Sequence, residues 1–360
     1  MKRLISVCLV VMTILIGTSC QLKPLTRAVY AVKNKPIQYA FDAFDTQCSI
    51  SLYGNLSEEV AGQYFFDMKK LVDNYDKTFS KTNEASEIYE INHRTGDSVM
   101  ISDETARIFE IASSLYDWSK GKFDISAGTL VDLWDVKNRK TLPTLDEINE
   151  ARSHTANFKY NIKYDVVEDE QRKNQITFYG DKLTQYDLGG LIKGYCADAL
   201  KEMLSRNDDI KACIVNLGGS VLCTGEVDGR AGNAFKVGIF KPFSGNDIID
   251  TIDVKNRNVI TSGNYQRYFK VDGDERVYHH IIDPTTGYPT NNGLDSVTIV
   301  SENGLLGDYL STACMLLGEE DSKKLIDFAS GSFNDNKIQA TFVHSDGKIT
   351  KYPENLDLTK

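Results

Sequence analysis

Apolar residues recur along this chain at two spacings, which predict strands and helices in alternation. Alternate residues are apolar in the second half of Phe44–Tyr53, and this pattern predicts a first strand. Apolar residues then recur three and four positions apart from Val60 to Tyr75, and this pattern predicts a helix. Ser57 stands where its side chain can cap that helix at its start, near Glu58.

The rest of the chain carries the same signals. Helices are predicted at about Asp103–Ser119, after the capping box of Thr144 and Glu147, from Lys193 to Leu200, and over Leu305–Leu317 with Gly318 at the end. Strands are predicted at Ile176–Tyr179, Ile214–Val215, Phe235–Phe240, Val259–Ile260 and Val297–Val300. Because helices and strands are interspersed and no Pro- or Gly-rich linker divides them, the predicted fold class is α+β. Residues 41–360 are expected to form one domain, in a single lobe or in two, with mixed or antiparallel sheets flanked by helices.

The N-terminus is predicted to direct export. Lys2 and Arg3 precede a 13-residue apolar run, Leu4–Ile16, which is too short to span a bilayer. Small residues lead from this run into Cys20, which resembles a bacterial lipobox. Residues 1–19 are therefore predicted to be a signal peptide, and residues 20–40 a lipidated N-terminus and tether. Ordinary secretion, with cleavage nearby, is the alternative.

Composition limits the classes of function. Lys and Arg total 41 against 51 Asp and Glu, which gives a formal charge of −10. Loss of Lys2 and Arg3 with the signal peptide would take the charge to −12. This balance argues against a nucleic-acid-binding protein, which needs a basic surface. The five cysteines beyond Cys20 include no C-x-x-C pair, so no zinc or redox motif follows, and we expect buried thiols.

The segment Asp187–Gly194, D-L-G-G-L-I-K-G, is the first candidate for chemistry. Paired glycines at a strand-to-helix turn let the backbone approach a ligand closely, and the start of a helix supplies free N–H groups. Lys193 adds a positive charge, so the segment indicates an anion site. A tight packing turn with a surface lysine is the alternative.

A second polar region runs from Thr261 to Phe269, T-S-G-N-Y-Q-R-Y-F, and continues at His279 with H-H-I-I-D-P-T-T-G. Asp283-Pro284 predicts a tight turn, and an imidazole just before it can act as a base, a metal ligand or a phosphate contact. Because neighbouring strand residues point to opposite faces, only one of His279 and His280 is expected to face a site. Two turns and a hairpin would explain the glycine and proline, but not the density of polar residues.

Asp308 and Thr312 stand one turn apart on the predicted helix Leu305–Leu317, so their oxygens face the same way. A carboxylate, a hydroxyl and a carbonyl from elsewhere would suit Mg²⁺. The alternative is an aspartate stabilised by the helix dipole and a threonine bonded back to its own helix. Asp124, beside Phe123 and ahead of small residues, is a further candidate for a pocket wall.

In this order, the segments resemble the ApbE family, the FAD:protein FMN transferases. The match runs from about Phe44 to Gly318. Its motifs are Ser86-Glu87-Ile88 with Asn92, Phe123-Asp124, D-L-G-G-x-x-K-G, Asn216–Gly219, T-S-G-x-Y-x-x-Y, H-x-x-D-P-x-T-G-x-P and the D-x-x-x-T helix. Members of this family have an α+β fold and are often lipoproteins on the outer face of the bacterial cytoplasmic membrane. The resemblance therefore agrees with export and with a lipid anchor on Cys20.

The resemblance implies transfer of the FMN half of FAD to a Thr or Ser hydroxyl of an acceptor protein. A phosphoester forms and AMP is released. FAD is then the substrate, Mg²⁺ the cofactor, and the expected acceptor a subunit of a membrane respiratory or electron-transfer complex; no nucleic acid is expected. The FAD site would lie between the lobes if the domain has two.

Position by position, the resemblance also implies roles for particular residues. The residues expected to bind FAD are Phe44, Thr82, Lys122, Phe123, Asp124, Asp187, Lys193, Thr261 and Ile282. The metal ligands would be Asp308, Thr312 and the backbone carbonyl of Gly190. Either the imidazole of His280, beside the diphosphate, or a nearby carboxylate, that of Asp283, would accept the proton of the acceptor hydroxyl.

The chain departs from the usual family pattern at three places. It has Phe44-Asp45-Thr46 where many members have Met-Gly-Thr, Thr82 where an aromatic residue is common, and Ser220 where Asp is common.

Two other functions fit the same residues: a Mg²⁺-dependent FAD pyrophosphatase that releases FMN and AMP, and an exported flavin-binding lipoprotein without turnover.

Overall fold

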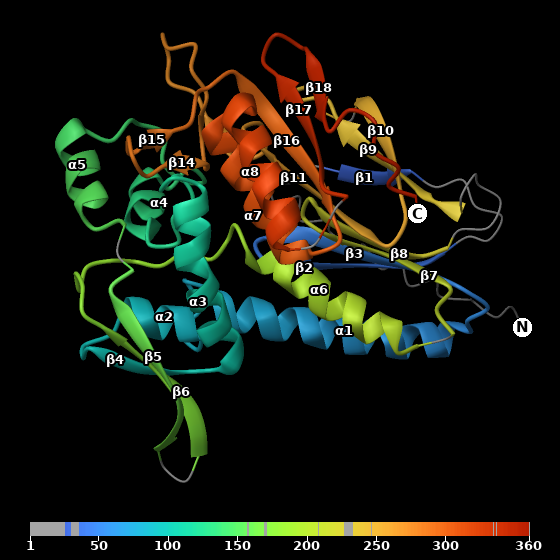
Figure 1. Ribbon diagram of the computed structural model, residues 1–360, viewed down its shortest axis with the longest axis horizontal. Helices are drawn as coiled ribbons and strands as arrows, with labels where there is room; N and C mark the ends of the chain where they lie inside the picture. Colours follow the sequence, from blue (N-terminus) through green and yellow to red (C-terminus); the bar gives the residue numbers. More distant parts are fainter. Residues whose placement is uncertain are drawn as a thin grey trace, which may run out of the picture.

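An eight-stranded sheet forms the centre of the computed structural model (Figure 1). From one edge to the other its strands are β2 (Ile37–Ala43), β3 (Thr46–Tyr53), β7 (Ala212–Leu217), β8 (Ser220–Gly225), β11 (Arg257–Gly263), β16 (Leu294–Ser301), β17 (Gln339–His344) and β18 (Ile349–Tyr352). Every neighbouring pair is antiparallel. The order of strands across the sheet is also their order along the chain.

The structure describes residues 26–29 and 36–359, except 157, 169–170, 208, 227–232, 246, 334 and 336. The expected signal peptide and Cys20 lie outside these residues. Within them, no helix is both long and apolar enough to cross a bilayer. Strand β1 (Thr26–Val29) and the start of β2 fall in the span expected to be a tether, so strands begin upstream of Phe41.

Both faces of the central sheet are covered. Helices α1 (Glu58–Phe79), α6 (Ile192–Ser205) and α7 (Gly304–Leu317) lie on one face, and β1 forms a small antiparallel sheet on the other with β9 (Phe235–Phe240) and β10 (Ile248–Val254) (Figure 1). In β7, Val215 packs into the helix-side cluster, whereas Ile214 packs under the small sheet. This burial on both faces explains why the first four residues of β7, Ala212–Val215, are a continuous apolar run without polar alternation.

The remaining elements form two groups beside the helix layer. One group is the antiparallel sheet of β4 (Ser98–Ile101), β6 (Gln171–Phe178) and β5 (Tyr160–Glu168), with α2 (Glu87–Asn92) and α3 (Asp103–Trp118). The other group is α4 (Gly128–Trp134), α5 (Leu145–Ser153), and the strand pairs β12 (Tyr268–Phe269) with β13 (Tyr278–His279) and β14 (Ile282–Asp283) with β15 (Tyr288–Pro289). Helix α8 (Glu319–Ser332) follows α7.

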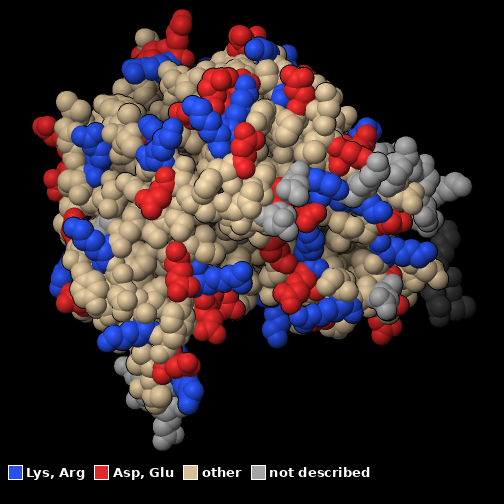
Figure 2. Space-filling model, viewed as in Figure 1, with Lys and Arg blue, Asp and Glu red and all other residues tan. Residues whose placement is uncertain are grey.

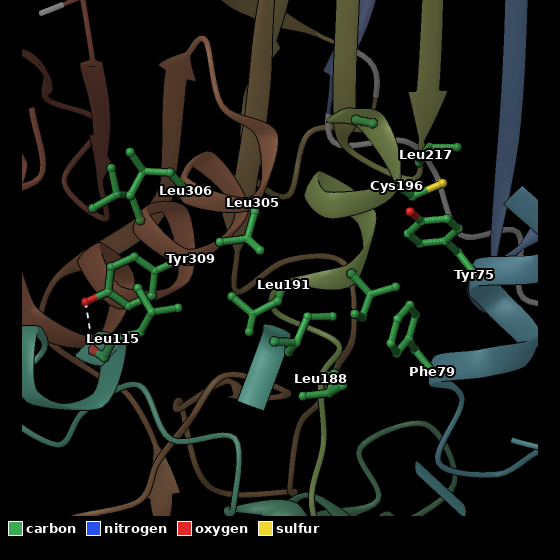
Figure 3. Packing of buried hydrophobic residues seen from close by; sticks show 14 of the residues in the cluster. Tyr75, Phe79, Leu115, Leu188, Leu191, Cys196, Leu217, Leu305, Leu306 and Tyr309 are labelled. Carbon is green, nitrogen blue, oxygen red and sulfur yellow. Dashed lines mark hydrogen bonds between the residues drawn. The ribbon is translucent and has the colours of Figure 1, made fainter. Parts of the chain in front are cut away.

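One large hydrophobic cluster joins the central sheet, the helices on it and the α3 layer. Figure 3 shows Leu188 and Leu191 packed between the aromatic rings of α1 and the leucines of α7. In the same cluster the Tyr309 hydroxyl donates to the carbonyl of Leu115 at 2.9 Å, which links α7 to α3. A smaller cluster surrounds Trp134. The continuous main core confirms a single α+β domain with antiparallel sheets.

The caps predicted at the start of two helices are confirmed. The Ser57 side chain accepts the N–H of Val60 at the start of α1, and Thr144 with Glu147 forms a complete capping box. The first strand starts two residues later than predicted, because Phe44 and Asp45 form the turn between β2 and β3. The cysteines of the described residues are buried free thiols, and burial raises the pKa of Cys48 to about 12.

Candidate active site

A cavity of about 390 Å³ lies where the main cluster meets the smaller cluster around Trp134. Ile281 belongs to the first cluster and Ile282 to the second, and both line the cavity. All the residues expected to bind FAD or the metal line it, as does His280: Phe44, Thr82, Lys122, Phe123, Asp124, Asp187, Gly190, Lys193, Thr261, Ile282, Asp308 and Thr312. The structure thus brings together segments that lie up to about 270 residues apart along the chain.

The last glycine of D-L-G-G-x-x-K-G serves the crossing of α6 and α7. A Cβ on Gly194 would lie 2.0 Å from the carbonyl oxygen of Gly304, and one on Gly304 would lie 2.3 Å from the carbonyl oxygen of Gly194. Only glycine at both positions lets the helices approach this closely. At the crossing, the Gly194 N–H donates to Asp308 Oδ2 at 2.9 Å, which fixes that carboxylate at the cavity wall.

The D-L-G-G turn differs from its prediction in two respects. No strand leads directly into it: β6 ends at Phe178, and among the described residues between β6 and the turn there is only a single bridge, which joins Gln185 to Ala127. Several N–H groups at the start of α6 are used inside the protein: that of Gly189 donates to Asp187 Oδ1, and those of Leu191 and Ile192 donate to the carbonyl of Leu188. Positive charge in the cavity therefore comes mainly from lysine and arginine side chains.

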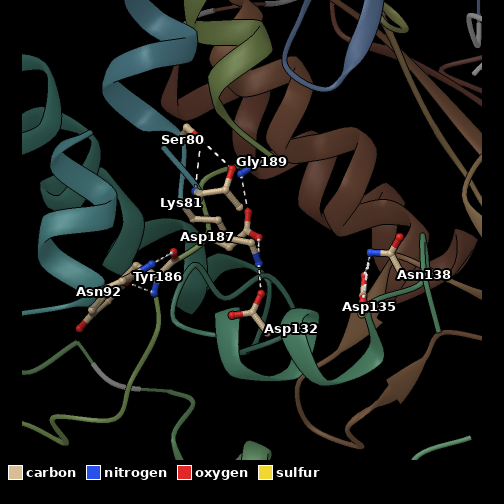
Figure 4. A network of polar contacts seen from close by, with 10 residues as sticks. Ser80, Lys81, Asn92, Asp132, Asp135, Asn138, Tyr186, Asp187 and Gly189 are labelled. Carbon is tan, nitrogen blue, oxygen red and sulfur yellow. Dashed lines mark hydrogen bonds and ion pairs between the residues drawn. The ribbon is translucent and has the colours of Figure 1, made fainter. Parts of the chain in front are cut away.

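Lys81 is a cavity residue that the sequence analysis missed. Its ammonium lies 3.0 Å from Asp187 Oδ2 and 2.6 Å from Asp132 Oδ1 (Figure 4). Burial disfavours the charged form of Lys81, but the carboxylates of Asp187 and Asp132 outweigh it and raise the pKa of Lys81 above its usual value. Burial likewise opposes ionisation of Asp187; Lys81 and the Gly189 N–H outweigh it, and the pKa of Asp187 falls below its usual value. Asp187 is thus held as an oriented carboxylate.

Lys193 projects into the cavity from the first turn of α6. Its Nζ lies 3.1 Å from the carbonyl oxygen of Gly189 and 3.7 Å from Asp308 Oδ1. Its side chain is 24% exposed, so it remains accessible to an anion in the cavity. Lys81, Asp187, Lys193 and Asp308 therefore alternate in charge along one wall.

Asp308, Thr312 and Gly190 form a set of hard oxygen donors. Asp308 Oδ1 is directed to the Lys193 side of the cavity, and Thr312 Oγ1 lies 3.6 Å from where a Cβ of Gly190 would stand. Within the described part of the chain, no three His, Cys, Asp or Glu side chains cluster as a metal site. A cation here would take its other donors from the Thr312 hydroxyl, a backbone carbonyl, water and phosphate, a mixture that suits Mg²⁺. The residues fit this ion.

Only one of the two adjacent histidines, His280, lines the cavity, as predicted. His279 is buried, its Nε2 donates to the carbonyl of Thr290 at 2.8 Å and its Nδ1 accepts the Ile281 N–H; burial lowers the pKa of His279 to about 4. His280 lines the cavity. Burial, with the nearby charge of Arg267, lowers the pKa of His280 to about 3, so its imidazole is neutral at pH 7. Because His280 Nδ1 lies 3.4 Å from the carbonyl of Arg267, an acceptor only, we assign the proton to Nδ1 and the lone pair to Nε2.

Asp283 does not line the cavity. Its Oδ2 contacts Lys122 Nζ, and its Oδ1 accepts the N–H and the hydroxyl of Thr285 at 2.9 and 2.7 Å. Lys122 also donates to Thr285 Oγ1 at 2.8 Å, so the turn after β14 holds the lysine at the cavity wall. Asp124 is fixed in a similar way, by the N–H and hydroxyl of Ser126 and by a backbone N–H at residue 156. Burial raises the pKa of Asp124 above its usual value.

The β2–β3 turn forms another wall. Phe44 and Asp45 have φ values of 53° and 56°, in the left-handed region that bulky residues seldom occupy. The turn is tied at two points: the Phe44 N–H donates to the carboxylate of Asp76 on α1, and Arg267 Nη2 donates to the carbonyl of Asp45 at 3.3 Å. These ties hold the Phe44 side chain against the cavity despite the unfavourable backbone conformation.

The other expected residues have local roles at the wall. Thr261 is buried, and its hydroxyl lies 2.8 Å from that of Thr298 on β16. Thr82 follows α1, and its hydroxyl lies 3.2 Å from that of Ser80. Figure 2 shows basic and acidic side chains interspersed over the face in view. The mixed charges of that face do not favour an anionic ligand, whereas the lysine and arginine side chains in the cavity do.

Comparisons with known proteins identify the family of this chain. The model of the ApbE family matches residues 44–334. The FAD:protein FMN transferase of Klebsiella pneumoniae (strain 342) is 29% identical over 290 residues, which cover 80% of this chain and 84% of the relative. That of Treponema pallidum (strain Nichols) is 27% identical over 84% of this chain and 83% of its own length.

Solved structures show the same architecture. The ApbE protein of Thermotoga maritima MSB8 superposes with a TM-score of 0.73 at 29% identity, over 88% of this chain and 96% of that protein. The flavin transferase ApbE of Vibrio cholerae, at 22% identity and a TM-score of 0.69 over 88% of this chain and 97% of that one, shares the fold.

Proposed function

The chain belongs to the ApbE family, and we propose that it is an FAD:protein FMN transferase. It transfers the FMN half of FAD to a Thr or Ser hydroxyl of an acceptor protein and releases AMP. One observation carries this proposal beyond the family match. A single cavity holds an accessible ammonium, that of Lys193, a pair of hard metal donors, Asp308 and Thr312, and a neutral imidazole, that of His280.

The reaction is a displacement at phosphorus. The acceptor oxygen bonds to the phosphorus of the FMN half, the bond from this phosphorus to the bridging oxygen breaks, and AMP leaves with that oxygen. Such a transfer depends mainly on positioning and on neutralising charge. Lys193 supplies positive charge beside Asp308, and Lys81 keeps Asp187 ionised and oriented at the same wall. When bound, Mg²⁺ would polarise the phosphoryl oxygens and stabilise the leaving phosphate.

We assign the proton acceptor to His280. Its ring lines the cavity and its Nε2 carries a lone pair, which can take the hydroxyl proton as the new phosphoester bond forms. Asp283 was the other candidate. Its carboxylate is paired with Lys122 and Thr285 outside the cavity lining, which makes it a positioning residue for Lys122.

The experiment combines the purified protein with FAD, MgCl₂ and an acceptor domain that carries a candidate threonine. An acceptor whose intact mass rises by one FMN group, with one AMP released, supports transfer. Free FMN with unmodified acceptor would instead identify a pyrophosphatase, and intact FAD would identify a flavin-binding protein without turnover. Asp308→Asn keeps the shape of the side chain and the acceptor for the Gly194 N–H, so it should retain the fold and lose Mg²⁺-dependent transfer. Chelation of Mg²⁺ should stop the wild-type reaction.

We further propose that the protein is exported and anchored on the outer face of the cytoplasmic membrane by lipid on Cys20. The basic residues and apolar run before Cys20 support this proposal. The acceptor would then be a membrane respiratory or electron-transfer subunit on the same side. Cys20→Ser should move the protein from the membrane fraction to the soluble exported fraction. Flavin fluorescence of membrane proteins separated with and without this chain would reveal the acceptor.

A further inference from the structure

Three hydroxyl groups link β11 to α7 beside the metal donors. Ser262 Oγ lies 2.8 Å from Ser311 Oγ and 3.2 Å from Thr312 Oγ1. The Ser311 hydroxyl lies 2.9 Å from the backbone carbonyl of Asp308, one turn earlier on α7. Ser311 is fully buried, whereas Ser262 and Thr312 line the cavity.

The carbonyl at the end of this chain sets the direction of every hydrogen bond in it. A carbonyl oxygen only accepts, so the single hydrogen of Ser311 is donated to Asp308. Ser311 Oγ must then accept from Ser262, which uses the single hydrogen of Ser262. Between Ser262 and Thr312 the only hydrogen left is that of Thr312, so Thr312 donates to Ser262. The Thr312 hydrogen therefore points to β11, and a lone pair of Oγ1 is left for the cavity.

We propose that Ser262 is a positioning residue that fixes the Thr312 hydroxyl with its lone pair, and not its hydrogen, toward a divalent cation held by Asp308. A cation is attracted by an oxygen lone pair and repelled by a hydroxyl hydrogen, so the direction of this hydroxyl contributes to metal affinity. The identification of the cation as Mg²⁺ rests on the proposed function. The direction of the hydroxyl rests on the hydrogen-bond chain alone.

The fold holds β11 and α7 close enough for these hydrogen bonds to form. A Cβ on Gly307 would lie 2.5 Å from Ser301 Oγ and 3.0 Å from Ile260 Cδ1, so a glycine here lets α7 sit directly on β11. Ser262 is two residues beyond Ile260 and reaches α7 one turn further along. The serine of the T-S-G motif, Ser262, thus has a proposed role that the sequence alone does not indicate.

Substitutions at either serine should weaken metal binding in different ways. In Ser262→Ala, the Thr312 hydroxyl loses its acceptor and rotates freely. In Ser311→Ala, the hydrogen of Ser262 is released and can be donated to Thr312, which turns the Thr312 hydrogen toward the cavity. Each change should raise the dissociation constant of the metal by about 2- to 12-fold, the value of one net hydrogen bond. Ser262→Thr keeps the hydroxyl and should bind metal like the wild type.

Mn²⁺ is the probe, because it takes the same hard oxygen ligands as Mg²⁺ and its binding is read by electron paramagnetic resonance without FAD or turnover. The full chain is titrated as wild type, Ser262→Ala, Ser262→Thr and Ser311→Ala. Ser296→Ala is the matched control, since Ser296 is a buried serine on the neighbouring strand β16 whose Oγ has no hydrogen-bond partner within the described part of the chain. Ser296→Ala should leave Mn²⁺ affinity unchanged.

The outcomes separate this proposal from the function itself. Weaker binding in both alanine variants, with recovery in Ser262→Thr, supports the hydroxyl chain. Wild-type affinity in Ser262→Ala refutes it, while the metal site stands. A wild-type protein that binds no Mn²⁺, either alone or with FAD present to supply phosphate oxygens, refutes the metal assignment and the hydroxyl proposal together. If Ser262→Ala does not fold, Ser311→Ala provides the test. Wild-type Mn²⁺ affinity in that variant also refutes the proposed chain of hydrogen bonds.

Discussion

Replacing Gly194 by alanine should damage both the stability of the protein and its metal site. The new Cβ would stand 2.0 Å from the carbonyl oxygen of Gly304, 2.5 Å from its carbonyl carbon and 2.8 Å from the Cβ of Asp308. The oxygen and carbon of Gly304 belong to the backbone and cannot rotate away. Helices α6 and α7 must therefore separate by roughly 1.4 Å or more to reach an ordinary contact distance.

The free energy of unfolding should fall by about 2 kcal/mol. Overpacking of a tight contact costs about 1–3 kcal/mol, and a backbone obstacle places this case at the upper end. The higher helix propensity of alanine offsets about 1 kcal/mol of that cost. With about 2.1 cal/mol/K of unfolding entropy per residue, a loss of about 2 kcal/mol lowers the Tm of a domain of about 320 residues by about 3 °C. The shift also moves the Gly194 N–H away from Asp308 Oδ2, so Mn²⁺ affinity should fall as well.

Differential scanning calorimetry and Mn²⁺ titration test both effects. Gly331→Ala is the matched control, because Gly331 lies in α8 and a Cβ there meets nothing within 4 Å. This control should stabilise the protein by up to about 1 kcal/mol and leave metal affinity unchanged. A Gly194→Ala protein with the Tm and Mn²⁺ affinity of the wild type would refute the argument that the α6–α7 crossing positions Asp308.

Three other perturbations have defined outcomes. Lys193→Met should raise the Kd for FAD by about 10- to 100-fold, the value of one charge-assisted hydrogen bond, whereas Lys201→Met on the same helix should not; quenching of flavin fluorescence measures both. Because burial lowers the pKa of His279 to about 4, the folded state binds fewer protons than the unfolded one, and stability should fall as the pH drops from about 6.5 to 4. In urea titrations at pH 7 and pH 5, His279→Gln should reduce this loss. Trp134→Phe removes the 2.7 Å bond to the buried carbonyl of Gly287 and should cost about 1–3 kcal/mol of unfolding free energy; an unchanged urea midpoint would contradict that.

The sequence predicts α1, α3, α5, α6 and α7 because their signals are local, whereas it does not predict α2, α4 or α8. Ser57 and the pair of Thr144 and Glu147 act within one turn of the residues they cap, so a short window contains the whole interaction. Strand β2 was missed, although apolar and polar residues alternate along it. It is an edge strand whose only neighbour in the central sheet is β3, and its apolar face is only partly buried. Its alternating pattern is therefore short and directly follows a polar segment, so it was read as part of that segment.

The candidate site shows where prediction from sequence ends. Motifs and family resemblance indicate which residues line the cavity, but not how they act on one another. Lys81 follows a helix as a single lysine, and its role depends on Asp132 and Asp187, which are distant in the chain. Gly194 looks like part of a ligand loop, and the structure uses it for helix packing. Such roles depend on the distances between packed elements, which no local pattern contains.

The strand order of the central sheet has a consequence for how the protein can be built. Each strand from β2 to β18 lies next to the strand that precedes it along the chain within that sheet, so a chain synthesised from its N-terminus can add every new strand to an edge already in place. No strand has to be inserted between two others, which keeps the search for partners short at each step. The cavity is completed later in synthesis than most of the sheet. It takes its wall from Phe44 at one end and from Thr312 and Leu316 at the other, so a nascent chain can hold most of the sheet before it holds a complete site.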